Sequence, residues 1–173
     1  MDSTNTGHTG HLGADVFASL RADPQRIIVL DEDGNLNAAD IINRAEAFAA
    51  ALMRHGCGPD SRIMMCLQSN IEALCGSLGC WLVGGASLLV DFRTPASQRA
   101  AIQKALGATI TIEDRRPAGE ANYDSVIIDD TWRHLPTVGF TNQDLNPPAS
   151  AIAYYALSSG TTGTPKIYAQ SHG

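Results

Sequence analysis

The fold of this chain is decided by residues 62–112, which have the sequence RIMMCLQSNIEALCGSLGCWLVGGASLLVDFRTPASQRAAIQKALGATITI. Short, nearly continuous apolar runs alternate with longer helix-like stretches, at residues 62–67, 71–83, 86–90, 98–106 and 109–112. Such continuous runs are typical of strands that are covered on both faces of a sheet. The strands start about 23 residues apart, which is the length that a strand, a helix and two short loops require. We therefore predict an α/β fold with a mostly parallel sheet of right-handed βαβ units.

The flanking sequence extends this pattern in both directions. Upstream, Asn37 can cap an amphipathic helix whose apolar face includes Ile41, Ala45 and Phe48. Within the central stretch, Asn70 is the predicted cap of the next helix. Further strands are predicted at residues 27–30, 125–128 and 151–157.

The central stretch is apolar enough to suggest a membrane span. Residues 73–90 carry no charge, and about 18 apolar residues suffice to cross a bilayer. Gly84 and Gly85, however, divide the run into a helix-like piece and a strand-like piece, as in a buried α/β core. We therefore expect no membrane span.

The composition and net charge of the chain exclude some classes of binding partner. Charged side chains make up 17% of the 173 residues, below the usual level of about 25%, and the formal net charge is −6. No basic stripe occurs, so we expect neither nucleic acid nor an anionic membrane as a partner. The composition favours a compact protein that binds small molecules.

Residues 1–14 are expected to form a flexible N-terminal tail. The first ten residues contain no Lys or Arg, and no apolar segment follows them, so we predict a cytoplasmic protein without a secretory signal. His8 and His11 lie in this tail without other ligand residues at a suitable spacing. The four cysteines form no C-x-x-C pair. No metal site is therefore predicted.

The stretch that suggests chemistry follows the last predicted strand and has the sequence SSGTTGTPK, residues 158–166. Gly160 and Gly163 allow positive φ angles, so successive backbone N–H groups can converge on phosphate oxygens. The hydroxyl groups add rotatable donors, and Lys166 adds a positive charge. A turn that merely joins two strands is the alternative, but the density of hydroxyl groups favours a phosphate site.

This stretch differs from the P-loop pattern G-x-x-x-x-G-K-[ST]. Lys166 follows Pro165, and Ile167 stands where a P-loop has Ser or Thr. A P-loop also opens a helix, whereas Ile167 and Tyr168 favour a strand. We therefore expect the chain to leave this loop as another strand.

Residues 155–166, YALSSGTTGTPK, resemble the AMP-binding signature of the adenylate-forming enzymes. These enzymes include acyl-CoA synthetases, luciferases and the adenylation domains of peptide synthetases. His172 stands where this family has a Thr-His or Ser-His pair after the loop. Two departures are visible, because Ile167 replaces the usual Gly and residues 91–93 are Asp-Phe-Arg where Asn-Pro-Arg is common.

The resemblance extends upstream and implies where the chain belongs in the family's architecture. Residues 52–59, 69–72 and 84–86 are similar to further family motifs. By this resemblance, residues 15–173 form the first part of the AMP-binding domain, truncated after the phosphate loop. They would be an incomplete part of the large N-terminal domain of adenylate-forming enzymes.

The resemblance also implies the roles of particular residues. In this family the loop holds the β- and γ-phosphates of ATP, and His172 would border the acyl or nucleotide pocket. The family's catalytic residues and magnesium ligands would follow residue 173, so neither is expected within this chain. The implied ATP phosphate-binding residues are Ser158, Ser159, Gly160, Thr161, Thr162, Gly163, Thr164 and Lys166.

Two classes of function follow. The first is a parent ATP-dependent acid–thiol ligase such as an acyl-CoA synthetase. It would use ATP with Mg²⁺ to convert a small carboxylic acid into acyl-AMP, and CoA or carrier-bound phosphopantetheine would accept the acyl group. Its further partner would be the missing remainder of the same chain. The second class is a catalytically inactive, stand-alone remnant that binds nucleotide weakly or docks a partner protein.

Overall fold

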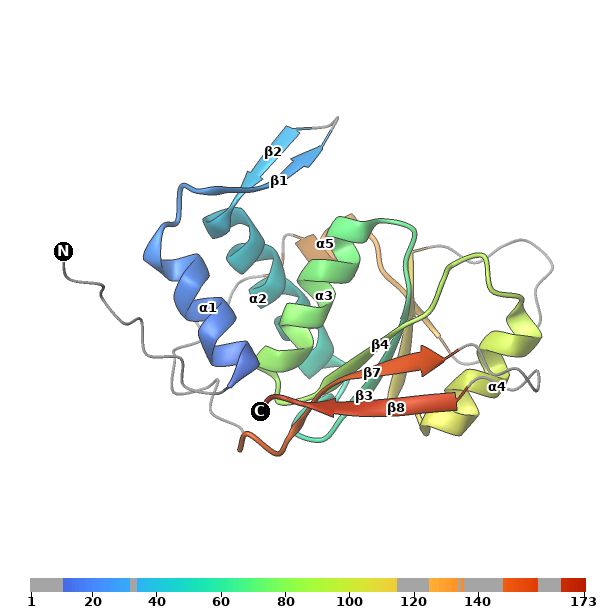
Figure 1. The fold of residues 1–173 in the computed structure, drawn as a ribbon. Helices are drawn as coiled ribbons and strands as arrows, with labels where there is room; N and C mark the ends of the chain where they lie inside the picture. Colours follow the sequence, from blue (N-terminus) through green and yellow to red (C-terminus); the bar gives the residue numbers. More distant parts are fainter. Residues whose placement is uncertain (1–10, 32–33, 115–124, 134, 136–147, 159–165) are drawn as a thin grey trace.

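A computed structural model describes residues 11–31, 34–114, 125–133, 135, 148–158 and 166–173 of this chain. Its main body is a six-stranded sheet, and a small two-stranded sheet projects from it (Figure 1). The six strands are β3 (Arg62–Cys66), β4 (Ala86–Leu89), β5 (Ile110–Glu113), β6 (Val126–Ile127), β7 (Ile152–Ser158) and β8 (Lys166–Ser171). They lie side by side in the order β6-β5-β3-β4-β7-β8.

Five neighbouring strands of this sheet are parallel to one another, namely β6, β5, β3, β4 and β7. Strand β3 is central, because Ile63 lies opposite Ser87 of β4 on one side and Ile110 of β5 on the other. Strand β8 is antiparallel to β7. The predicted α/β class, with its mostly parallel sheet, is therefore confirmed, and so is the strand expected after the loop.

Helices cover the sheet from both sides. Helices α2 (Ala38–Arg54) and α3 (Asn70–Leu82) pack on one face, and α4 (Ala96–Leu106) packs on the other. Successive residues of β3 point to opposite faces. Met65 therefore belongs to the core under α2 and α3, whereas Met64 packs with Ile102 of α4. Both methionines are fully buried.

The helix caps follow from short sequence signals. Asn37 caps α2 as predicted, and its Oδ1 accepts the Asp40 N–H while the Asp40 carboxylate accepts the Asn37 N–H. Helix α3 begins one residue earlier than predicted, because the Ser69 hydroxyl accepts the Glu72 N–H and Ser69 is the cap. Asn70 is therefore the first residue of the helix and does not cap it.

The start of the described chain corrects one expectation. Helix α1 (Leu12–Ala22) begins inside residues 1–14, for which the sequence predicts a flexible tail. His11 is its cap and is buried, and Phe17 and Leu20 pack into the core. The boundary expected after residue 14 therefore falls within a helix. Residues 1–10, including His8, lie outside the described residues.

The remaining elements lie at the periphery of the sheet. Strands β1 (Ile27–Asp31) and β2 (Gly34–Asn37) form the antiparallel two-stranded sheet at the top of Figure 1. A short helix, α5 (Asp130–Arg133), follows β6 and contacts α2. Among the described residues, every helix falls short of the length or hydrophobicity that crossing a membrane requires.

Candidate functional site

The hydroxyl-rich stretch connects the two strands at one side of the sheet. Strand β7 ends at Ser158, β8 begins at Lys166, and these two residues are cross-strand neighbours. Lys166 is exposed and Ser158 is partly buried. The other predicted phosphate-binding residues, 159–164, lie outside the described residues, and so does Pro165.

The carboxyl ends of the parallel strands meet at the edge from which this stretch begins. Leu88 of β4 lies opposite Tyr155 of β7, so Asp91 and Ser158, each three residues further along, reach the same edge. Ligands of parallel α/β sheets bind outside the carboxyl ends of the strands. The pairing therefore places the start of the predicted phosphate loop at the edge where a ligand is expected.

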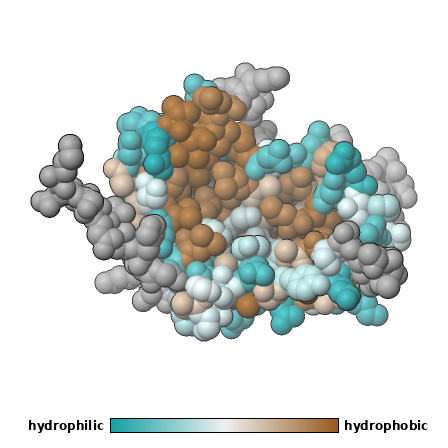
Figure 2. Space-filling view, in the orientation of Figure 1, coloured by the Kyte–Doolittle hydropathy of each residue, from teal (hydrophilic) through white to brown (hydrophobic). Residues whose placement is uncertain are grey.

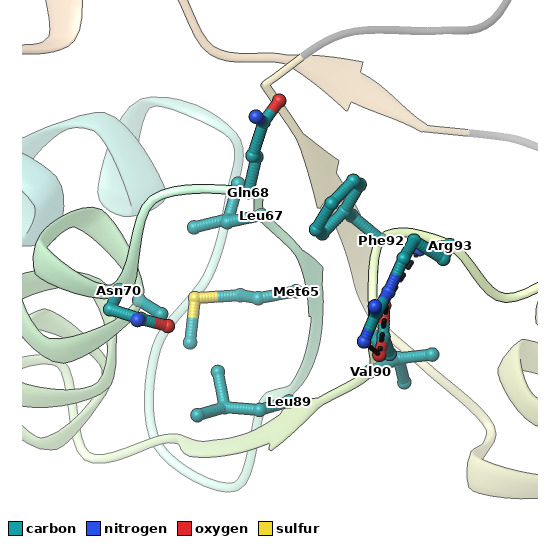
Figure 3. A pocket seen from close by; sticks show the side chains of 10 residues that line it. Met65, Leu67, Gln68, Asn70, Leu89, Val90, Phe92 and Arg93 are labelled. Carbon is teal, nitrogen blue, oxygen red and sulfur yellow. Dashed lines mark hydrogen bonds and ion pairs between the residues drawn. The ribbon is translucent and has the colours of Figure 1, made fainter.

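A hollow of about 270 Å³ opens beside this point, at the carboxyl ends of β3 and β4 (Figure 3). The chain leaves β3 towards one face of the sheet through α3 and leaves β4 towards the other face through α4. A crevice forms where successive connections diverge in this way. Met65 and Leu89 form part of the apolar floor, and Asn70 faces Phe92 and Arg93 across it (Figure 3).

A fixed ion pair forms one wall of this hollow. The Arg93 guanidinium donates to both carboxylate oxygens of Asp91, with Nη2 2.6 Å from Oδ2 and Nε 3.0 Å from Oδ1. These side-chain hydrogen bonds, followed by the one from the Arg93 backbone N–H, lower the pKa of Asp91 to about 2. Asp91 is therefore ionised at neutral pH and holds Arg93 in place, although so exposed a pair contributes little to stability.

Sequence reasoning did not identify the residues of this hollow. Asn70 enters the sequence argument as a predicted helix cap, and residues 69–72 and 91–93 enter it through their likeness to family motifs. The usable signal was their position, because Gln68 and Asn70 follow one buried strand and Asp91 follows the next. Polar residues directly after parallel strands gather at one edge of a sheet.

A second hollow, of about 430 Å³, lies at the carboxyl ends of β5 and β6. Its lining includes Asp114, Asp129 and the buried Glu72. The Arg44 guanidinium lies 3.5 Å from the Glu72 carboxylate. Despite these acids, the described part of the chain contains no group of three His, Cys, Asp or Glu that could hold a metal ion.

His172 lies at the other end of β8 from Lys166. It is buried, its ring is stacked on that of His11, and it contacts Trp81 edge to face. It is absent from the linings of the two hollows described above and of a groove beside β7. The structure therefore places this residue, which the resemblance puts at a pocket edge, in the contact between β8, α1 and α3.

The described side chains at the carboxyl edge suit an anionic ligand that also has an apolar part. Lys166 brings a positive charge and Arg93 a guanidinium whose charge Asp91 balances, while Ser158 and Asn70 bring hydrogen-bonding groups. The apolar floor formed by Met65 and Leu89 lies beside Asn70 and Arg93. Pockets for small molecules commonly combine such a floor with a few convergent polar groups.

Comparison with known proteins agrees with this architecture. Residues 16–173 match the family model described as AMP-binding enzyme. One of the proteins that make up linear gramicidin synthase in Brevibacillus parabrevis is 26% identical over 156 residues, covering 87% of this chain and 2% of that protein. Pyochelin synthetase PchF of Pseudomonas aeruginosa is 29% identical over 154 residues, covering 86% of this chain and 8% of that protein.

Solved structures show the same fold. The N-terminal subdomain of Klebsiella oxytoca NpsA, in complex with 3-hydroxybenzoyl-AMSN, superposes with a TM-score of 0.79 at 18% identity, over 94% of this chain and 41% of that one. The N-terminal domain of FACL13 from Mycobacterium tuberculosis gives 0.77 at 16% identity, over 94% and 44%. This chain thus spans less than half of either structure. The predicted resemblance to the N-terminal part of adenylate-forming enzymes is confirmed, and the chain belongs to the AMP-binding enzyme family.

Proposed function

We propose that this chain is the first part of the adenylating domain of an ATP-dependent ligase, in which residues 158–166 bind the β- and γ-phosphates of ATP. In the reaction, a carboxylate oxygen of the substrate attacks the α-phosphorus and displaces pyrophosphate, which leaves acyl-AMP. A thiolate then attacks the acyl carbon and releases AMP. The observation that supports this proposal is the position of Ser158 and Lys166, the first and last residues of the SSGTTGTPK sequence, at the carboxyl edge of the sheet.

The chemistry of the loop residues supports this role. Backbone N–H groups beside Gly160 and Gly163, together with the hydroxyls of Thr161 and Thr162, would donate to phosphate oxygens. Lys166 would supply a positive charge close to them. Such groups act by positioning the phosphates and by stabilising the charge that develops as pyrophosphate leaves.

Mg²⁺ would accompany ATP and neutralise part of the phosphate charge. The described residues provide no cluster of acidic ligands for it. Mg²⁺ commonly keeps several waters and binds substrate phosphates together with one or two carboxylates. We therefore assign this chain the phosphate contacts and no dedicated metal-binding group.

We further propose that the acyl acceptor is phosphopantetheine on a carrier protein. The support comes from the relatives, because one of those that match, nlsA of Emericella nidulans, is named as a nonribosomal peptide synthetase. NpsA has also been studied as an artificially fused adenylation–PCP di-domain with ThdA. CoA, the alternative acceptor, is the expectation for an acyl-CoA synthetase.

The phosphate-binding step can be tested on the 173-residue chain itself. Isothermal titration with ATP and Mg²⁺ would compare the natural protein with Lys166→Ala and Thr161→Ala. Each variant removes one proposed phosphate contact, so we expect affinity to fall about tenfold, the effect of losing about 1.4 kcal/mol. Circular dichroism should show unchanged folding, because Lys166 is exposed and the loss of a single hydroxyl group usually changes stability little.

Lys104→Ala is the matched control for charge. Lys104 lies in the last turn of α4, at the opposite edge of the sheet from the loop, so this variant should bind ATP like the natural protein. Absence of ATP binding, or equal weakening by Lys104→Ala and Lys166→Ala, would contradict the proposal. Pyrophosphate exchange with a panel of carboxylic acids, in a longer protein that contains this chain, tests the ligase step.

A further inference from the structure

Two buried histidines join the start of α1 to the end of β8, although they are far apart in the sequence (Figure 1). The side chains of His11 and His172 are each 6% exposed. Their rings are stacked, with centroids 4.1 Å apart and an interplanar angle of 13°. The backbone reinforces the contact, because the Leu12 N–H donates to the His172 carbonyl at 2.9 Å.

Each imidazole also accepts a backbone hydrogen bond from the first turn of α1. The Gly13 N–H donates to His172 Nδ1 at 3.2 Å, and the Ala14 N–H donates to His11 Nδ1 at 3.0 Å. The first N–H groups of a helix have no partner within the helix, so these rings satisfy two of them. A nitrogen that accepts a hydrogen bond carries no proton, so the His172 ring is neutral in this arrangement.

Protonation of His172 is incompatible with this arrangement for two reasons. A protonated imidazole has N–H at both nitrogens, so the bond from Gly13 would be lost. The positive charge would also lie at the positive end of the α1 dipole. The surroundings of His172 therefore favour its neutral ring.

We propose that the His11–His172 contact is a pH-sensitive latch, which fastens the first turn of α1 to the end of β8 when the His172 ring is neutral and releases that turn when His172 is protonated. The sheet and the helices α2 to α4 remain folded, because their cores do not depend on the two rings. The latch also acts on the β7–β8 pair, since the His172 N–H donates to the Ala151 carbonyl just before β7.

The direction of the pH effect follows from the surroundings of His172. Burial first, and the neighbouring His11 second, lower its pKa from 6.5 to about 4. In the released state the ring regains its ordinary pKa and takes up a proton more readily. The latch is thus at full strength above about pH 6.5 and weakens about tenfold for each pH unit between 6.5 and 4.

Other charged groups on the surrounding elements do not reverse this direction. Helix α1 carries Asp15 in its first turn and Arg21 in its last. Glu72 lies in the first turn of α3, whereas Trp81, which touches His172, lies in its last. Lys166 begins β8, and His172 follows its end. His11 is the ionisable side chain that acts on the charge of His172.

Hydrogen–deuterium exchange of the 173-residue chain between pH 4.5 and 7.5 tests the latch, once the intrinsic pH dependence of exchange has been removed. The readout is the protection of the peptide that covers the first turn of α1, compared with a peptide from α2. We expect α1 protection to fall about tenfold per pH unit below 6.5, as linkage to one proton requires. Protection of α2 should stay constant.

The double variant His11→Asn/His172→Asn is the matched control. Asparagine Oδ1 can accept the same backbone N–H groups, and Asn is a preferred helix cap, but it does not titrate in this range. Its α1 protection should therefore not change with pH. Equal pH dependence in the variant and the natural protein would overturn the latch. So would loss of α2 protection together with α1, because the transition would then be global.

Proton NMR titration of the imidazole Cε1–H signals provides a second test that needs no variant. The natural protein should show one histidine that titrates well below pH 6 while the core signals stay native. If all histidine signals titrated at the ordinary value of about 6.5 in the folded protein, the proposal would be wrong.

Discussion

At the scale of single residues, the ion pair between Arg99 and Glu113 is almost completely buried. Arg99 Nη1 lies 2.9 Å from Glu113 Oε1, and the side chains are 2% and 0% exposed. The Ser125 hydroxyl donates to the other carboxylate oxygen. In a core of low polarity, a charge that loses its partner is strongly unfavourable.

Glu113→Leu should therefore destabilise the protein by about 3–5 kcal/mol, because it removes the carboxylate that lies 2.9 Å from the buried Arg99 guanidinium. Urea unfolding followed by circular dichroism measures this. Arg99→Met combined with Glu113→Leu removes both charges and should recover most of the lost stability. If the double variant were as unstable as the single one, packing rather than charge would account for the loss.

At the scale of elements, the contact between α2 and α3 depends on a glycine. A Cβ at Gly79 would lie 2.8 Å from the Cβ of Phe48 and 2.9 Å from the Ala45 carbonyl oxygen. Those atoms belong to the backbone or are bonded directly to it, so they can move away only if helix α2 itself shifts, which costs free energy. The two helices can approach this closely only where no side chain stands between them.

Gly79→Ala should destabilise the protein by about 1–2 kcal/mol, because overpacking at the helix contact outweighs the better helix propensity of alanine. Gly58→Ala is the matched control, since a Cβ there meets no atom within 4 Å. We expect that variant to stay within about 0.5 kcal/mol of the natural protein. Equal urea midpoints for the two variants would contradict this prediction. They would mean that α2 and α3 can move apart enough to accommodate the added methyl group.

Elements that depend on local sequence signals can be predicted from the sequence, whereas elements that depend on distant contacts cannot. The capping box at Asn37 and the apolar run of β3 are local signals, so α2 and the parallel sheet are predictable. Helix α1 is not, because His11 is not a preferred cap and the contact that holds it comes from His172, 159 positions from Gly13.

The candidate site could likewise be predicted only in part from the sequence. The SSGTTGTPK sequence is recognisable by itself. Its first and last residues, Ser158 and Lys166, end β7 and begin β8, next to the two strands that the sequence predicts. The hollow beside it depends on parallel pairing between β3 and β4, which brings Asn70 and Arg93 to one place. The proximity of these two residues arises only when β3 and β4 pair in the folded sheet, so the sequence does not show it.

At the scale of the whole molecule, one face of the sheet is only partly covered. Helix α3 packs over β3 and β4, and beyond it a groove of about 390 Å³ runs beside β7. Leu89, Tyr154 and Tyr168 are 51%, 41% and 49% exposed on this side. Figure 2 shows a broad hydrophobic area over the helical part of the molecule and a smaller one beside it.

An apolar face of this kind favours association in water. We therefore expect the weight-average mass of the 173-residue chain, measured by sedimentation equilibrium, to rise with protein concentration over the micromolar range. Ammonium sulfate should strengthen the association, because it promotes apolar burial and screens the repulsion between chains of net charge −6.

Tyr154→Thr combined with Tyr168→Thr should weaken this association, since threonine keeps a high strand propensity while removing both aromatic rings from the exposed face. Leu30→Thr is the control, because Leu30 is 78% exposed but lies on β1, in the separate two-stranded sheet. If the control lowered the mass as much as the tyrosine variant, association would not depend on the sheet face. A monomer at every concentration would contradict the prediction and would mean that the net charge outweighs the attraction between the exposed apolar faces.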